Sequence, residues 1–236
     1  MERIMRGGRF ILLGTLILSF FTSTGYAAGV ALSSTRVIYD GSKKEASLMV
    51  NNKSTTDEFL IQSWIDDING SKKTPFIITP PLFKLNPTKN NVLRIVKTTD
   101  ALPQDRESVY WINVKSIPAQ SEGSADKNVL QIAVRTRLKL FYRPAGLQGK
   151  SMDGWETLRF SRVGKHQLSV TNPSAFNLTF NQLYADGHAV EKLGMVPAKG
   201  SLIIQLPAEV GQVKDVKYNI INDFGTAGEM LTQHLN

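Results

Sequence analysis

Apolar and polar residues alternate in short segments along most of the chain, which is the period of a β-strand with one buried face. The segments are rich in Val, Ile, Phe, Tyr and Thr, and clusters of Gly, Pro, Asn, Asp and Ser separate them. No segment keeps a helical period for three turns, and the pattern predicts an all-β protein with at least thirteen strands. The clearest predicted strands are Thr35–Tyr39, Ala46–Asn51, Phe59–Asp66, Val92–Val96, Val109–Lys115, Gln167–Thr171, Leu178–Tyr184, Ser201–Leu206 and Lys214–Ile221.

A segment with proline and glycine, Arg143–Lys150, divides the predicted strands into two groups. The two groups cover about 120 and about 85 residues, and each is the size of one Ig-like sandwich. We therefore predict two Ig-like β-sandwich domains, over residues 28–147 and 148–236.

The first 27 residues have the layout of a secretory signal peptide. Arg3, Arg6 and Arg9 precede an apolar run over residues 10–21, and small residues stand at Gly25 and Ala27. The run is about a dozen residues long, whereas a helix that spans a bilayer needs ~20. We expect cleavage after Ala27 and export of the remainder.

Cysteine and charge narrow the possibilities further. The chain has no cysteine, so an exported protein of this sequence has neither disulfides nor thiolate metal sites. Its net charge of +8 falls to +6 without the first 27 residues, because that segment holds three arginines and one glutamate. The basic residues are dispersed among acidic ones, which argues against nucleic-acid binding but allows an acidic partner.

The longest alternating segment runs from Val129 to Tyr142. At ~3.3 Å per residue it would span roughly 46 Å, about twice the usual strand length. Such a strand could overrun its own sheet and offer an apolar ladder, beginning with Leu130, Ile132 and Val134, to a strand of another chain. The alternative is that all fourteen residues lie in one covered sheet.

Several motifs, in order along the chain, resemble those of the periplasmic pilus chaperones of the chaperone–usher pathway. They are Thr35–Tyr39, Leu102–Val114, Ile117–Pro118, Leu130–Ala133, Arg137–Pro144, Val170–Pro173 and Ile221–Gly225. The loop between Pro118 and Val129 is short and the chain lacks cysteine, which resembles the short-loop subgroup of that family.

The resemblance implies a boomerang of two Ig-like domains, a periplasmic location and a chaperone function. Members bind and cap pilin subunits by donor-strand complementation and deliver them to an outer-membrane usher. Leu130, Ile132 and Val134 would then fill the groove of the subunit. No cofactor is expected, and the free chaperone could cap its own exposed strand by forming a dimer.

The resemblance also assigns roles to five charged residues. Arg36 and Lys139 match the pair that anchors the C-terminal carboxylate of the subunit in the cleft between the domains. Glu107, Arg143 and Asp223 match a salt bridge between the domains. The expected role of this second group is structural, because ion networks can specify a domain orientation.

An enzyme is the first competing interpretation, and its candidate residues are few. Ser124 and Lys127 have the Ser-x-x-Lys spacing of penicillin-recognising enzymes, without the other motifs of that class. The three histidines lack zinc-binding spacing. Asp66 and Asp67 are adjacent, so their side chains should point apart into solvent.

An exported adhesive or carbohydrate-binding sandwich is the second competing interpretation. A carbohydrate-binding protein would be expected to show exposed aromatic residues on one face. The aromatic residues Trp64, Tyr110, Trp111 and Phe141 lie inside strand patterns, and we expect them in the core. The pattern therefore favours a chaperone over this alternative.

Overall fold

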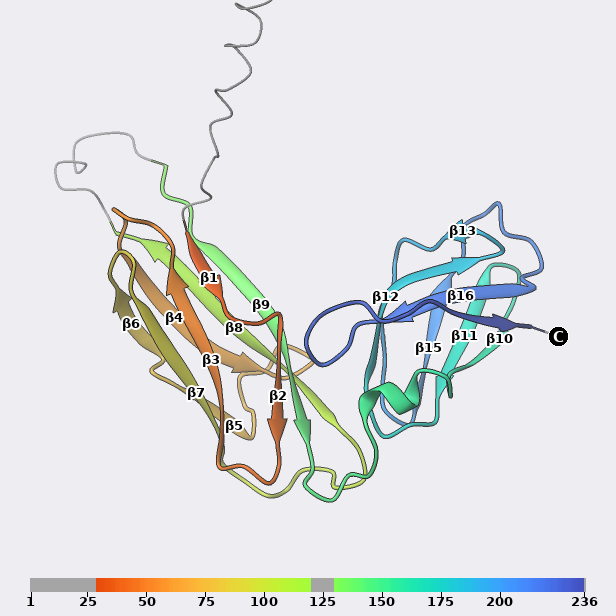
Figure 1. The fold of residues 1–236 in the computed structure, drawn as a ribbon, viewed down its shortest axis with the longest axis horizontal. Coiled ribbons are helices and arrows are strands. Elements are labelled where there is room, and N and C mark those ends of the chain that lie inside the picture. Colours follow the sequence, from red (N-terminus) through yellow and green to blue (C-terminus); the bar gives the residue numbers. More distant parts are fainter. Residues whose placement is uncertain (1–28, 120–129, 236) are drawn as a thin grey trace, which may run out of the picture.

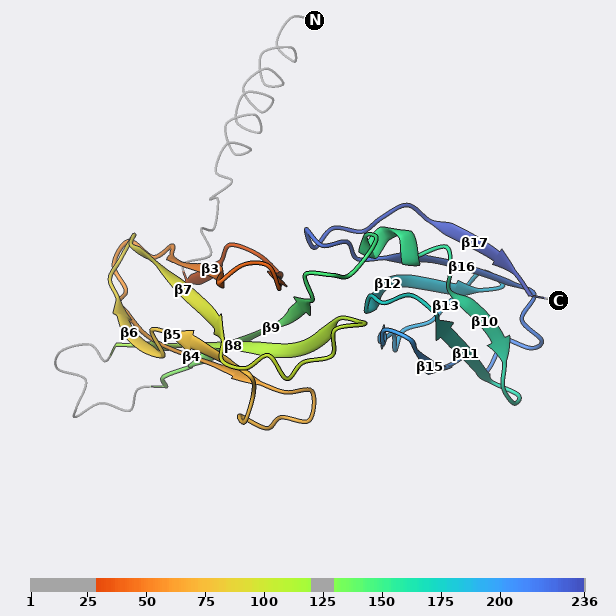
Figure 2. The same cartoon turned by 90° about the horizontal axis from the view of Figure 1, so that it is seen from below.

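The computed structural model describes residues 29–119 and 130–235. The expected signal peptide, residues 120–129 of the short loop, and Ser124 and Lys127 lie outside these residues. Figures 1 and 2 show two lobes, each built from packed β-sheets, that meet at an angle like the arms of a boomerang. No helix among the described residues is long and apolar enough to cross a membrane.

The N-terminal lobe is a sandwich of two sheets. The first sheet has the order β1–β3–β7–β5, with β1 (Val30–Leu32), β3 (Glu45–Asn52), β7 (Asn90–Lys97) and β5 (Phe76–Thr79). The second has the order β2–β9–β8–β4–β6, with β2 (Arg36–Asp40), β9 (Val134–Arg143), β8 (Ser108–Pro118), β4 (Phe59–Asp66) and β6 (Leu82–Leu85). All pairs are antiparallel except β2 with β9, which are parallel.

The C-terminal lobe begins with a single 3-10 turn, η2 (Ser151–Gly154), and is a second sandwich. One sheet has the order β10–β11–β15, with β10 (Arg159–Arg162), β11 (Gln167–Asn172) and β15 (Gly200–Gln205). The other has the order β13–β12–β16–β17, and β14 also pairs with β12. Its strands are β12 (Leu178–Ala185), β13 (His188–Ala189), β14 (Met195–Val196), β16 (Asp215–Ile220) and β17 (Leu231–His234).

The predicted strands agree with the structure, which has seventeen in the described residues, but the longest prediction is wrong at its start. β9 begins at Val134, and residues 130–133 are not in a strand. Alternation alone does not make a strand, because the backbone also needs a partner for its hydrogen bonds. The last residue of β8 paired with β9 is Ser116, opposite Val134.

Each lobe has its own hydrophobic core. The core of the N-terminal lobe draws its buried residues from between Val37 and Tyr142, whereas that of the C-terminal lobe draws them from between Trp155 and Ile220. Leu138, Leu140 and Tyr142, on the inward face of β9, are part of the first core. The C-terminal part of β9 is thus held rigidly by packing.

A buried asparagine ties down the loops at one end of each sandwich in the same way. Asn172, at the end of β11, donates its side-chain amide to the carbonyl oxygens of Phe176 and Pro197 at 2.7 and 3.1 Å. Its Oδ1 accepts from the backbone of Ser174 at 3.0 Å. Asn52, at the end of β3, does the same in the other lobe, where it donates to loop carbonyls and accepts from the backbone of Ser54.

We predict that Asn172→Ala lowers the free energy of unfolding by about 2–3 kcal/mol, because buried loop carbonyls lose their donor. Denaturant unfolding of the purified protein measures the change. Asn69→Ala, at an exposed turn, is the control and should change the value by less than about 0.5 kcal/mol. Equal effects of the two substitutions would contradict the prediction.

Candidate functional site

Arg36 and Lys139 lie side by side because β2 and β9 are parallel. The register places Arg36 directly opposite Lys139, at the first residue of β2. The guanidinium of Arg36 donates to the carbonyl oxygen of Ile221 at 3.1 Å, and the ammonium of Lys139 donates to Oγ1 of Thr179 at 2.9 Å. The side chains of Arg36 and Lys139 therefore both extend from the N-terminal lobe to the C-terminal lobe.

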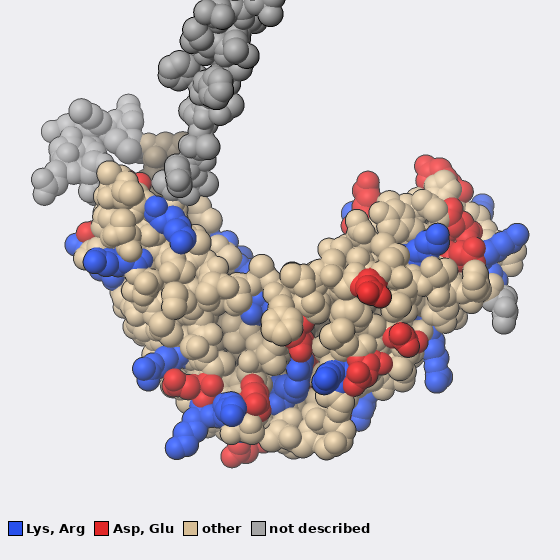
Figure 3. Space-filling view, viewed as in Figure 1, with Lys and Arg blue, Asp and Glu red and all other residues tan. Residues whose placement is uncertain are grey.

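A pocket of about 360 Å³ lies at this point between the lobes. Its lining includes three cations and no carboxylate, and consists of Thr35, Arg36, Trp111, Arg137, Leu138, Lys139, Thr179, Ile221 and Gly225. Figure 3 shows the open hollow between the lobes, with basic and acidic side chains gathered near its base. A pocket of this composition is suited to an anionic group.

Gly225 brings the C-terminal lobe against the pocket. Its φ is +86°, and a side chain at this position would collide with Oγ1 of Thr35. The side chain of Asn222 holds the same loop by accepting from the backbone of Phe224 and Thr226 at 3.0 and 3.1 Å. The loop is thus fixed where it borders the two cations.

Burial disfavours the charged forms of both cations. Burial lowers the pKa of Lys139 to about 8, and the positive charge of Arg36 adds to this effect. Burial likewise lowers the pKa of Arg36, although Asp223 and Glu107 oppose it. An anion in the pocket would relieve both penalties, so the site is prepared to bind one.

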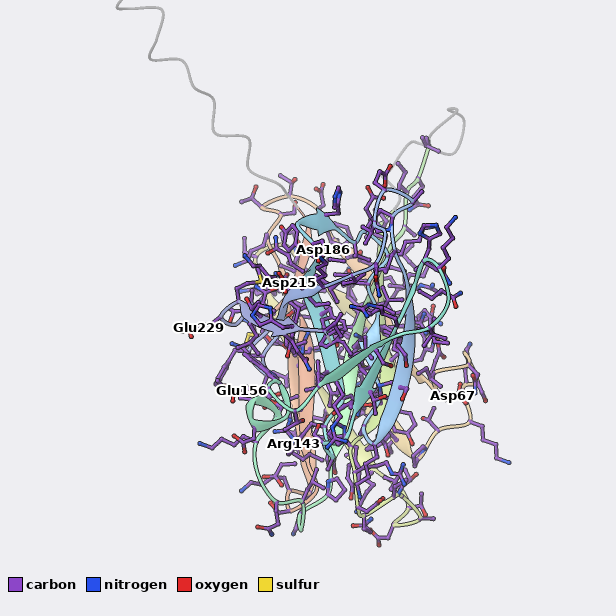
Figure 4. The ribbon with its side chains drawn as sticks, turned by 90° about the vertical axis from the view of Figure 1, so that its right-hand side faces the viewer. Asp67, Arg143, Glu156, Asp186, Asp215 and Glu229 are labelled. Carbon is purple, nitrogen blue, oxygen red and sulfur yellow. The ribbon has the colours of Figure 1, made fainter. Side chains whose placement is uncertain are left out.

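Arg143, labelled in Figure 4, joins two carboxylates at the junction of the lobes. It contacts Glu107 of its own lobe at 2.7 Å and Asp223 of the other lobe at 3.0 Å. Ser151 also donates to Asp223, at 2.9 Å, and the backbone of Asn177 donates to Glu107, at 2.9 Å. The three residues expected to form a salt bridge between the domains are thus in contact.

The two carboxylates respond differently to these surroundings. Burial raises the pKa of Glu107, and the charge of Arg143 offsets only part of that effect. Burial would also raise the pKa of Asp223, but the hydrogen bonds from Arg143 and Ser151 outweigh it and keep the pKa low. Arg143 therefore favours the charged form of both carboxylates, and at Glu107 it opposes the larger effect of burial.

The three expected groove-filling residues lie further along the same segment, away from the cations. Leu130, Ile132 and Val134 are 84%, 65% and 56% exposed. One edge of β9 pairs with β8, and the other edge pairs with β2 only from Lys139 to Arg143. Among the described residues, no strand pairs with this second edge at residues 134–138. An apolar ladder and an unpaired strand edge therefore lead to the cationic pocket.

Three expectations about side chains are wrong. Trp111 lies on the outward face of β8 and lines the pocket, so it is not a core residue. Trp64 is also only half-buried and outside the core, with the ammonium of Lys72 5.6 Å from its ring centroid. Tyr110 packs against the core and Phe141 is 2% exposed, as expected. Asp66 is not solvated, because it is 8% exposed and accepts from the side chain of Asn113 at 3.0 Å. The residues that cover Trp111 and Asp66 come from neighbouring strands, which a single segment of sequence does not reveal.

Comparison with known proteins places this arrangement in a family. The model described as "Pili and flagellar-assembly chaperone, PapD N-terminal domain" matches residues 29–148, and "Pili assembly chaperone PapD, C-terminal domain" matches residues 153–230. The chain therefore belongs to the PapD-like family of pilus-assembly chaperones. This membership supports the interpretation that it is not an enzyme, and it favours a chaperone over an adhesive or carbohydrate-binding protein.

Individual relatives cover nearly the whole chain. "Chaperone protein LpfB" of Salmonella typhimurium is 73% identical over 232 residues, which are 98% of this chain and 100% of the relative. "Probable fimbrial chaperone LpfB" of Escherichia coli O157:H7 is 64% identical over 237 residues and covers 100% of both chains. Both are relatives of similar length, so the comparison concerns the complete two-lobed arrangement.

Solved structures of chaperones have the same two-lobed fold. The structure of "Salmonella enterica SafA pilin in complex with the SafB chaperone" matches with a TM-score of 0.80 and 30% identity, over 88% of this chain and 97% of that one. "Crystal Structure of the Periplasmic Chaperone SfaE" matches with a TM-score of 0.76 and 38% identity, over 88% and 100%. The boomerang of two Ig-like lobes is thus the fold of known chaperones.

We predict that Arg143→Ala lowers the free energy of unfolding by about 3 kcal/mol, because the Glu107 side chain, only 1% exposed, would remain buried without its cation. Denaturant unfolding measures the loss. Arg94→Ala, whose side chain is 65% exposed in a long contact with Glu45, is the control and should cost less than about 1 kcal/mol. A loss no larger than that of the control would show that Arg143 is dispensable.

Proposed function

We propose that this chain is a periplasmic chaperone that binds and caps pilin subunits by donor-strand complementation and delivers them to an outer-membrane usher. One observation carries the proposal: an exposed apolar ladder and a free strand edge lead directly to a cationic pocket between the lobes. A single extended segment of another chain could use all three features at once. Its final strand would pair with β9 and its terminal carboxylate would enter the pocket.

The direction of the bound strand follows from β2. β2 begins at Arg36, so a strand added to the free edge of β9 would lie in line with β2, ahead of its first residue. Its C-terminus can meet Arg36 and Lys139 only if it runs toward them, that is, parallel to β9. β2 already pairs with β9 in this direction, so the geometry needs no change in the sheet.

The anchor and the ladder have separate tasks. Leu130, Ile132 and Val134 would enter the groove of the subunit, and each would contribute roughly 1.5 to 3 kcal/mol before ordering costs. Arg36 and Lys139 would hold the carboxylate by charge-assisted hydrogen bonds and set the register. Register matters because a slip of one residue turns every apolar side chain away from the groove.

The contacts of Arg143 with Glu107 and Asp223 would hold the two lobes at the angle that forms the pocket. This role is structural, since the three side chains are occupied by one another and by Ser151 and Asn177. Delivery to an usher and export through a cleaved signal peptide complete the proposed function. One of the similar solved structures, that of SfaE, is of a periplasmic chaperone, which supports that location.

We predict that Arg36→Ala and Lys139→Ala fold normally but fail to protect subunits, because each removes one donor to the terminal carboxylate. Each variant is co-expressed with a candidate pilin that forms a soluble complex with the unaltered protein, and the soluble one-to-one complex is measured. Lys84→Ala, on an exposed strand, is the control and should give the yield of the unaltered protein. An unchanged yield with both pocket variants would refute the anchoring role.

We also predict that affinity for an acetylated peptide of the last pilin strand, with a free carboxylate, falls about tenfold between pH 7 and pH 9.5. The pKa of Lys139 is about 8 in the free protein, so above that pH the lysine must take up a proton to hold an anion. Fluorescence anisotropy measures the affinity. Lys139→Arg should bind with little pH dependence, and an equal fall in this variant would contradict the prediction.

A further inference from the structure

The outward face of β9 carries a cation that the proposed anchor does not use. Side chains at Arg135, Arg137 and Lys139 point to this face, whereas Leu138 and Leu140 point into the core. Arg137 lines the same pocket as Arg36 and Lys139, but Arg135 does not. The pocket therefore holds a third positive charge, two residues before Lys139.

Trp111 holds this third cation in place. The guanidinium of Arg137 lies over the indole ring with its central carbon 4.1 Å from the ring centroid. The ammonium of Lys139, which is opposite Trp111 in the β8–β9 register, lies 5.9 Å from the same ring. Stacking on an aromatic face restricts the guanidinium without using its N–H groups.

The hydrogen bonds of the three cations differ. Arg36 donates to Ile221 and Lys139 donates to Thr179. The guanidinium of Arg137 has no hydrogen bond or ion pair with any residue of 29–119 or 130–235, and it has five N–H donors. Arg137 is thus a preoriented cation with its donors free to bind a ligand.

The spacing indicates which group Arg137 would bind. Arg36 and Lys139 can together donate to both oxygens of a terminal carboxylate, which leaves the N–H donors of Arg137, two residues before Lys139 on the strand, for a second group. A strand added beside β9 turns alternate side chains to the outward face. Of its last two residues, one therefore turns its side chain toward the face that carries Arg137.

We propose that Arg137, held on Trp111, recognises an oxygen-bearing side chain, a carboxylate or a carboxamide, on one of the last two residues of the subunit. Arg36 and Lys139 hold the end of the chain, and Arg137 reads the side chain beside it. The pocket then selects among subunits as well as anchoring them. This inference rests on the proposed function, because it requires the subunit to end in the pocket.

The test uses acetylated peptides of the last strand of a pilin that forms a soluble complex with this chain, with Glu, Gln or Met at the last or the penultimate position. The mature chaperone should bind in the order Glu, Gln, Met at one of the two positions, with Glu about tenfold tighter than Met. Arg137→Ala should abolish this order, and Arg137→Lys, which cannot form a planar bidentate contact, should weaken it. Arg135→Ala should leave it unchanged.

The proposal is overturned if the peptides show no affinity order at either position, or if the order survives in Arg137→Ala. It is also overturned if Arg135→Ala loses the order to the same extent as Arg137→Ala, because that result would indicate general attraction by positive charge. Amidated peptides separate this proposal from the anchor. If amidation does not weaken binding, the anchor itself is wrong. If amidation weakens binding but Arg137→Ala does not change the affinity order, Arg36 and Lys139 still bind the terminal carboxylate, and only the recognition of the side chain by Arg137 is wrong.

Discussion

The parallel pairing of β2 with β9 is the constraint on which the rest of the site depends. It sets Arg36 beside Lys139, and it ends there, so the remainder of β9 keeps an unpaired edge. Had β2 started a few residues earlier, its own backbone would cover the edge on which the proposed guest strand would pair. The place where one strand of the N-terminal lobe begins thus determines both where the cations stand and how much of β9 remains available.

The C-terminal lobe forms one wall of the pocket in which the free edge of β9 ends. Ile221, Thr179 and Gly225 supply one wall of the pocket, and the first two also accept hydrogen bonds from the cations. Arg143 ties Asp223 of the same loop to the buried Glu107. The pocket and the ion pair between the lobes therefore share one short loop, because Ile221 and Asp223 are two residues apart, and the proposed binding would be coupled to lobe orientation.

Much of the fold follows from local pattern, because the strands are short, alternate regularly and end at turn-forming residues. The start of β9 did not follow, since alternation continues through Leu130 and Ile132 where no neighbouring strand offers hydrogen bonds. Arg36 and Lys139 were found through family motifs, since nothing in either segment shows that they are partners. Trp111 was missed because a tryptophan in an alternating strand looks the same whether its face meets the core or a cleft.

The matching asparagines Asn52 and Asn172 have a consequence for the chemistry that the protein tolerates. Each closes its sandwich with amide hydrogen bonds, in a chain that has no sulfhydryl group. Reductants and oxidants of thiols therefore leave its shape unaltered. Such a molecule can hold a guest whose own cysteines are still unoxidised without becoming trapped with it in a mixed disulfide.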